Sequence, residues 1–353
     1  MLKMTKEHDN QEEINEKLID KKVDRRNFLK RSGQTFGALM AAGLFKFNFS
    51  TKGAKASEGD LSDKLIILHT NDMHGRIEIN EEDGIMGMPY VSSIVQDFRE
   101  NYENVLLLDA GDTVHGRPIS DRLYGSSTIE TMNAIGYDIM TAGNHDFNFG
   151  YDRLLELEEM MNAELVSSNV EKDGELLFKP YTIREVAGRQ IGILGIATPA
   201  TRYTTHPDNI EGIDFTSMRE ATEHYVEEMR SEYDLDLLVA LGHVGYGANN
   251  PDDEDFTVTD ELVTNVDGID IFVDGHSHTR IPEGDWHNDT LVVQAYEYLK
   301  KVGVVEIDFS NDQPEFQAHL ISAEEAIANY EPDPELEEIL SDARDDARDA
   351  MLG

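Results

Sequence analysis

The stretch "GNHDFNFG" at residues 143–150 follows the apolar run "YDIMTA" at 137–142 and places an amide, an imidazole and a carboxylate directly after a glycine. A short apolar run of this kind is typical of a buried strand. Asn144, His145 and Asp146 would then begin where the strand ends. Because ligands of α/β proteins collect at the carboxyl ends of strands, this stretch predicts both an α/β fold and a site within it.

Similar apolar runs occur along the chain, and each leads into polar residues. They lie at residues 64–72, 104–112, 191–200, 235–245 and 269–278. Helix-like segments separate several of them, and this alternation predicts a layered α/β fold. Two later runs, at 290–296 and 301–309, have no helix between them and are expected to close the fold as an antiparallel pair.

Candidate metal ligands stand at the ends of five runs. They are Asp72, His74, Asp112, Asn144, His243, His276 and His278. The chain has no cysteine, so thiolate sites are excluded, and this set of imidazoles and carboxylates suits Mn, Zn, Fe or Co better than Ca or Mg. A single histidine after a strand is more often a hydrogen-bonded structural residue. Five of them, the four listed and His145, together with aspartate and asparagine favour a metal site.

The order of these motifs is similar to that of a known family. The motifs D-x-H, GD, GNH, GH and GHSH resemble those of the calcineurin-like metallophosphoesterase superfamily. "LHTNDMHGR" at 68–76 and "GNHDF" at 143–147 resemble its 5'-nucleotidase branch in particular. The resemblance covers about residues 63–310. It implies a layered αββα sandwich with mixed central sheets, and hydrolysis of phosphomonoesters such as nucleotides.

The resemblance also implies two divalent metal ions that share one carboxylate. The first ion would be held by Asp72, His74 and His278, the second by Asn144, His243 and His276, with Asp112 bridging both. Water bound to such ions becomes hydroxide near neutral pH and can attack phosphorus in line. Two divalent cations with two aspartates leave the site positive, which suits a phosphate dianion.

His145 and Asn148 are the candidate catalytic residues outside the ligand set. The resemblance implies that His145 contacts the phosphoryl oxygens and assists the leaving group. In 5'-nucleotidases an aspartate three residues later orients this histidine, and here Asn148 takes its place. An amide can accept a hydrogen bond from an imidazole N–H but lends no charge. Relatives with asparagine there include 2',3'-cyclic phosphodiesterase-like enzymes, so that activity is an alternative. Asp146 is expected to be a structural turn residue.

Arg76 and Arg117 are the nearest cations for a substrate phosphate, alongside Asn144 and His145. An exposed arginine is the commoner explanation for each. The other histidines near the motifs are expected to make local packing contacts or hydrogen bonds; these are His69, His115 and His206.

The N-terminal segment 1–56 has the pattern of an export signal. Basic "DRRNFLKR" at 24–31 precedes apolar "GALMAAGLF" at 37–45 and "AKA" at 54–56. The arginine pair resembles a twin-arginine signal, which implies the Tat export machinery as a partner and a periplasmic, cell-surface or extracellular location. We therefore expect three parts: the signal, a catalytic domain at 57–310, and an acidic C-terminal helix or tail at 311–353.

The resemblance to 5'-nucleotidases is confined to their N-terminal half. In those enzymes a C-terminal domain supplies aromatic and arginine contacts to the nucleotide. The chain is therefore expected to act either alone with broad specificity, or with a separate substrate-binding domain or subunit. Two further alternatives are a thiosulfate-oxidising hydrolase of the same superfamily and a non-catalytic binding module. The complete ligand set favours an enzyme.

The formal charge of -41 over 353 residues is spread along the chain. Such a surface repels the phosphates of nucleic acids, so a nucleic-acid partner is not expected. The sequence instead predicts an acidic, solvated surface adapted to high salt.

Added salt is expected to stabilise the protein. Repulsion between surface carboxylates opposes the compact state in dilute buffer, and at 1 M salt the Debye length falls to about 3 Å, which screens it. Melting temperatures measured from dilute buffer to molar NaCl should therefore rise. A steady fall with added salt would contradict the halophilic interpretation.

Overall fold

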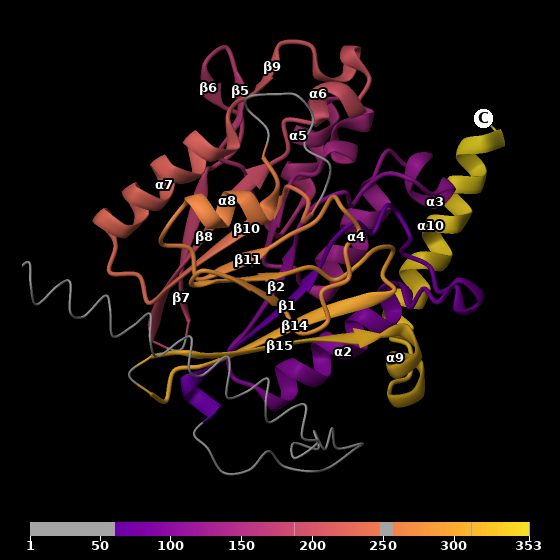
Figure 1. Ribbon diagram of the computed structural model, residues 1–353. Coiled ribbons are helices and arrows are strands. Elements are labelled where there is room, and N and C mark those ends of the chain that lie inside the picture. The colour runs from indigo at the N-terminus through magenta and orange to yellow at the C-terminus, as the bar shows by residue number, and fades with distance from the viewer. Residues whose placement is uncertain (1–60, 187, 248–256, 312, 353) are drawn as a thin grey trace, which may run out of the picture. The chain divides into compact units, whose positions relative to one another are not determined.

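The computed structural model describes residues 61–186, 188–247, 257–311 and 313–352 (Figure 1). The predicted export signal lies outside the described residues. The described residues belong to one compact unit. Within them, no helix combines the length and apolar character that a membrane span requires.

The first sheet has six strands. Their order is β15 (Glu315–Ser322), β14 (Lys301–Asp308), β1 (Lys64–Thr70), β2 (Val105–Asp109), β3 (Ile139–Thr141) and β4 (Glu164–Val166). Strands β1 to β4 run parallel, whereas β14 pairs antiparallel with both β1 and β15. The carboxyl ends of β1, β2 and β3 therefore meet at one edge of the sheet.

The second sheet also has six strands. Their order is β12 (Asp285–His287), β13 (Thr290–Val293), β11 (Ile271–Val273), β10 (Leu237–His243), β8 (Arg189–Ala197) and β7 (Tyr181–Val186). The inner four are parallel, and β12 and β7 are antiparallel edges. A small third sheet contains β6 (Glu175–Leu176), β5 (Val170–Lys172) and β9 (Ile213–Phe215).

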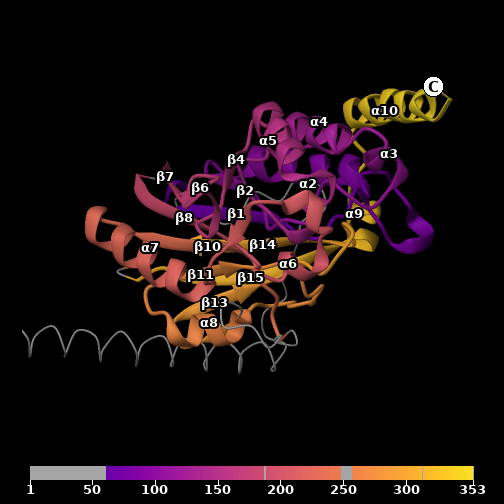
Figure 2. The same cartoon turned by 90° about the horizontal axis from the view of Figure 1, so that it is seen from above.

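Helices cover the outer faces of the two main sheets (Figure 2). One side carries α2 (Gly87–Asn101), α4 (Ser126–Ile135), α5 (Tyr151–Met160) and α10 (Pro334–Leu352), and the other carries α7 (Met218–Glu232) and α8 (Thr259–Asn265). Shorter helices are η1 (Leu61–Asp63), η2 (Glu81–Asp83), α3 (Pro118–Asp121), η3 (Asn144–Phe149), α6 (Thr201–Thr204), η4 (Pro207–Ile210) and α9 (Ala323–Asn329). The predicted αββα layering with mixed sheets is confirmed.

The strand sequences are apolar on both faces because both faces are buried. In β1, Leu65 and Ile67 lie in the core between the sheets, where they join Ile193 from β8. The alternating residues Ile66 and Leu68 lie in the core beneath the helices. Successive side chains point to opposite faces of the strand, and both faces are buried, so every position is apolar and the runs are continuous.

The expected antiparallel pairing of 290–296 with 301–309 is wrong. Strand β13 pairs parallel with β11 in the second sheet, whereas β14 pairs antiparallel with β1 in the first. The connection between them crosses from one sheet to the other. Since both runs are buried on both faces, their composition does not indicate which neighbours they pair with.

The segment after residue 310, expected to be an acidic helix or tail, contains the acidic helix α10 and also adds a strand to the first sheet. Strand β15 pairs along the whole of β14. In α10, Leu336, Leu340 and Ala343 are buried in the core that also contains helix α2 residues. Their spacing of four and three residues gives this acidic helix one apolar stripe. The C-terminal segment therefore completes the catalytic unit.

Candidate metal centre and active site

Six of the seven predicted ligand side chains come together from loops of both main sheets, and Asn144, the seventh, lies next to His145 in the chain and has a buried side-chain oxygen. The first sheet contributes Asp72 and His74 after β1, Asp112 after β2 and Asn144 after β3, and the second contributes His243 at the end of β10 with His276 and His278 after β11. The site thus lies where the carboxyl ends of two stacked sheets meet, as the strand-end motifs predict.

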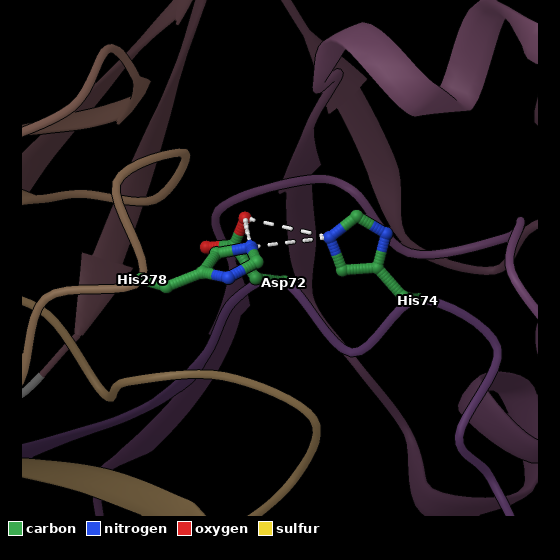
Figure 3. A group of neighbouring side chains, drawn as sticks. All are labelled: Asp72, His74 and His278. Atoms are coloured by element: carbon green, nitrogen blue, oxygen red, sulfur yellow. Dashed lines mark hydrogen bonds and ion pairs between the residues drawn. The ribbon is translucent and has the colours of Figure 1, made fainter.

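Asp72, His74 and His278 form the first group of ligand atoms (Figure 3). His278 Nε2 lies 3.2 Å from Asp72 Oδ1 and 3.3 Å from His74 Nε2, and His74 Nε2 lies 3.9 Å from Asp72 Oδ1. Ligands about 2.0–2.2 Å from one ion stand at such separations from each other. The geometry therefore fits a shared divalent ion.

Asp112, His243 and His276 form a second group. Asp112 Oδ2 lies 3.2 Å from His243 Nε2 and 3.6 Å from His74 Nε2, so this carboxylate faces both groups. Asn144 Oδ1 is buried and has no hydrogen-bond partner among the described residues, whereas the buried His243 Nε2 faces the carboxylate of Asp112. A buried polar atom without a partner costs about 1–3 kcal/mol, and a bound cation would satisfy Asn144 Oδ1. The residues present therefore fit a second ion.

Five of these residues adopt the left-handed backbone region, which non-glycine residues rarely occupy. They are Asp72, His74, Asp112, His276 and His278, with φ between 48° and 73°. Each such residue costs about 1–2 kcal/mol. Strain of this kind persists only where the surrounding structure imposes it, and it gathers at functional sites. Its coincidence with the ligand positions supports the metal centre.

A second layer of hydrogen bonds orients the ligands. His278 Nδ1 lies 2.8 Å from Glu297 Oε2, and His243 Nδ1 donates to the carbonyl oxygen of Ala110 at 2.7 Å. Asn71 Nδ2 donates to Asp72 Oδ2 at 2.7 Å. These contacts turn both Nε2 atoms toward the centre, as is usual for metal-binding histidines. The sequence analysis missed Glu297; the only signal was its place among polar residues directly after an apolar run.

Asp112 and His243 form a buried charge pair in the metal-free protein. Burial alone would raise the pKa of Asp112, but nearby histidines, His243 first, hold this pKa far below its usual range. Burial would lower the pKa of His243, but Asp112 outweighs it and raises this pKa to about 10. A cation at His243 must therefore displace a proton.

Asp146 joins the loops that carry Asp112 and Asn144. Its carboxylate accepts four hydrogen bonds of 2.8–3.0 Å, from the backbone N–H groups of Gly143, Asp112, Thr113 and Val114. Gly143 must be glycine, since a Cβ there would lie 2.3 Å from Asp112 N. Asp146 is thus a structural residue, as predicted, and its carboxylate faces these amides.

Replacing Asp146 with alanine is expected to lower the free energy of unfolding by at least about 3 kcal/mol, because four buried N–H groups lose their acceptor. Asp146→Asn should have a smaller effect, since one amide oxygen can still accept. Denaturant unfolding of the metal-loaded protein measures both. Asp152→Asn, an exposed change in α5, is the charge-matched control. An alanine variant as stable as this control would contradict the structural role.

His145 lies beside both groups, and its ring is half-buried. Its ligand atom lies within 4.8 Å of those of His74 and Asp112, and its backbone N–H donates to Asp112 Oδ1 at 2.7 Å. The amide nitrogen of Asn148 donates to Nδ1 of His145 at 2.7 Å and to Nδ1 of His115 at 3.1 Å. An amide could also accept from an imidazole N–H, but here it is the amide nitrogen, a donor, that faces Nδ1 of His145. Donation to Nδ1 leaves the proton of neutral His145 on Nε2.

The remaining predicted residues lie outside the two groups of ligand atoms. Arg76 and Arg117 line a cavity of about 340 Å³ next to the metal ligands. His69 is buried in β1, and His206 is exposed before η4, both in local roles as expected. His115 also makes packing and hydrogen-bonding contacts as expected: its ring stacks parallel to that of His145 with 5.8 Å between centroids, and it contacts Asn148.

Two carboxylate-and-imidazole groups with buried unpartnered ligand atoms, at the carboxyl edges of an αββα sandwich, define a metal-dependent phosphoester hydrolase. Residues 65–280 match the calcineurin-like phosphoesterase family. The chain belongs to this family.

Known relatives agree with this assignment. A 5'-nucleotidase of Vibrio cholerae is 32% identical over 293 residues, which are 75% of this chain and 52% of that protein. The structure of a 5'-nucleotidase precursor from Thermus thermophilus has a TM-score of 0.65 at 26% identity, covering 82% of this chain and 59% of the other. The phosphoesterase YfkN from Bacillus subtilis has a TM-score of 0.70 at 23% identity, covering 82% and 99%. The chain spans about half the length of the curated relatives it matches.

Proposed function

We propose that this protein is an exported phosphomonoesterase that hydrolyses nucleotides and uses two divalent ions of the Mn, Zn, Fe or Co type. The supporting observation is that two groups of ligand atoms share the buried carboxylate of Asp112, with the imidazole of His145 beside them. Similarity to 5'-nucleotidases supports the substrate class. Export by the Tat route rests on the sequence pattern of residues 1–56.

The ligand roles follow from the two groups. The first ion would be held by Asp72, His74 and His278, the second by Asn144, His243 and His276, and both by Asp112. Such ions supply Lewis acidity and lower the pKa of a bound water. Because Asn144 is neutral, it leaves more positive charge for a phosphate dianion than an aspartate would.

His145 holds a proton where the leaving group departs. Asn148 donates to its Nδ1, so Nε2–H can donate to a phosphoryl or leaving-group oxygen. The hydrogen bond from the His145 backbone to Asp112 fixes this residue relative to the centre. Asn148 also favours a second candidate activity, hydrolysis of 2',3'-cyclic nucleotides, as in relatives that carry asparagine there. A separate domain or subunit would supply further contacts to the nucleoside.

A phosphate-release screen tests the proposed function. The protein without residues 1–56 is loaded with Mn or Zn and given AMP, 2',3'-cyclic AMP, a sugar phosphate and an aryl phosphate. We expect AMP to be hydrolysed. A preference for the cyclic ester, detected as nucleoside monophosphate by chromatography, would support the second activity instead. Metal-loaded protein that hydrolyses none of them would contradict the proposal.

His145→Gln is expected to lower kcat for AMP by about 10²–10⁴-fold, because the alkoxide leaving group needs a proton. An aryl phosphate with an acidic phenol needs little such help, so its loss should be much smaller. Turnover of both substrates by wild type and variant gives the ratio. His206→Gln, an exposed change, is the control. Equal losses on both substrates would show that His145 does not assist the leaving group.

A further inference from the structure

A cavity of about 340 Å³ lies beside the first group of ligand atoms. It is lined by residues of the loop 75–85 and by Arg117, and none of the seven predicted ligands is among its lining residues. Most of the lining is polar or charged, including Arg76, Glu78 and Asn80. This volume suits a phosphate-sized group with part of the molecule that carries it.

Arg76 is held in a fixed orientation at the wall of this cavity. Its Cζ lies 3.4 Å from the centroid of the Tyr298 ring, and its Nη1 donates to the carbonyl oxygen of His74 at 3.1 Å. A guanidinium stacked on an aromatic ring loses little freedom when its remaining N–H groups bind an oxyanion. Arg76 is therefore preorganised for an anion.

The charges around the cavity leave both arginines available. Within the part of the chain that the structure describes, neither Arg76 nor Arg117 forms an ion pair with a carboxylate. Glu78 of the lining is neutralised by Arg344, which reaches it from α10 at 2.5 Å. Glu81 is the other acidic residue of the lining, and it is exposed. The lining thus carries two arginines beside two glutamates, one of them paired with Arg344, and is less acidic than the chain as a whole, whose formal charge is -41.

The cavity adjoins the metal centre but is distinct from it. The ring centroid of Tyr298 lies 5.6 Å from that of His74 and 5.4 Å from that of His278, and Arg76 stacks on the same ring. Arg76 thus contacts the Tyr298 ring and the backbone of His74 rather than the side-chain ligand atoms of the first group.

We propose that Arg76 and Arg117 bind a second anionic group of the substrate, carried on a different carbon atom from the scissile phosphate. The substrate class is then organic bisphosphates, or phosphate esters that bear a carboxylate. This inference rests on the phosphoesterase function proposed above. The two arginines would then select the substrate rather than hold the phosphate that is cleaved.

Matched substrate pairs test the inference with metal-loaded protein. Adenosine 3',5'-bisphosphate is compared with AMP to test a phosphate as the second anionic group. 3-Phosphoglycerate is compared with glycerol 3-phosphate to test a carboxylate in that role. Initial rates give kcat/KM, and chromatography identifies the ester that is cleaved. We expect the doubly anionic member of at least one pair to be preferred by about tenfold, as for charge-assisted hydrogen bonds.

Arg76→Gln and Arg117→Gln are expected to reduce this preference to about one. Arg117 is exposed, so its variant should fold even if loss of the Tyr298 contact disturbs Arg76→Gln. Arg219→Gln in α7 removes the same charge from an exposed pair with Glu223 and should keep the preference. The inference is overturned if wild type shows no preference, or if Arg219→Gln lowers it as much as Arg117→Gln. If wild type hydrolyses none of these esters, the proposed function fails and the inference fails with it; if it hydrolyses AMP and glycerol 3-phosphate as efficiently as their doubly anionic counterparts, only the inference fails.

Discussion

Asp112→Asn is expected to lower kcat for AMP by about 10³-fold or more. The Asp112 carboxylate lies 3.2 Å from His243 Nε2 and 3.6 Å from His74 Nε2, so it faces both groups of ligand atoms. Asparagine keeps the volume but removes the negative charge that balances two divalent ions. Both ions should therefore bind more weakly, and the Lewis acidity that they supply would be lost.

Phosphate release and elemental analysis of the same samples separate the two effects. We expect fewer than two metal ions per chain in the variant and two in the wild type. Asp152→Asn, the exposed control in α5, should keep both metal content and turnover. An Asp112→Asn protein with more than a tenth of wild-type turnover would show that this carboxylate does not bridge the centre.

Removal of the metal ions is expected to lower the melting temperature by about 10 °C. A ligand present at 1,000 times its dissociation constant stabilises the folded state by about 4 kcal/mol. In a large domain each kcal/mol shifts the melting temperature by about 2–4 °C, so the two together give a shift of this size. The metal-free site also leaves Asn144 Oδ1 without a partner among the described residues. Melting curves after chelation, and after metal is restored, measure the shift. Chelation should lower the melting temperature of the Asp112→Asn variant by much less.

This stabilisation by metal should grow as pH rises from 6 to 9. In the metal-free protein the pKa of His243 is raised to about 10, so the pair with Asp112 stabilises the fold fully below pH 6.5 and is lost as pH rises toward 10. Metal binding must release that proton and therefore strengthens with pH, by up to about tenfold per unit. Burial lowers the pKa of His74 and of His276 to about 4, so neither adds a proton in this range. Burial opposes the charged form of His278 as well, but Asp72 outweighs it and raises this pKa, so His278 also releases a proton when metal binds. If the difference between the melting temperatures of the metal-loaded and metal-free proteins narrows as pH rises, the result would contradict His243 as a ligand.

Much of the site could be predicted because its chemistry is local in sequence. Each candidate ligand directly follows an apolar run, and strand ends of a parallel sheet meet at one edge, so the structure brings six of the seven into two adjoining groups. The residues that support them were not predictable in the same way. Glu297 belongs to no sequence motif and is distant from His278 in the chain, so their contact could not be predicted. The amide of Asn148 faces His115 as well as His145 only because two loops pack together.

The order of apolar runs, glycines and histidines determined the fold class, the edge of the sheets that carries the site, and the identity of its ligand atoms, because burial and turn formation act over a few residues. The tertiary structure decided which sheet receives β13 and β14, that the acidic helix α10 packs against the core, and that Asp146 joins two ligand loops. It also placed Arg76 and Arg117 at a cavity outside the ligand set. These outcomes depend on contacts between distant segments, where several pairings bury similar apolar area and only the complete packing selects one.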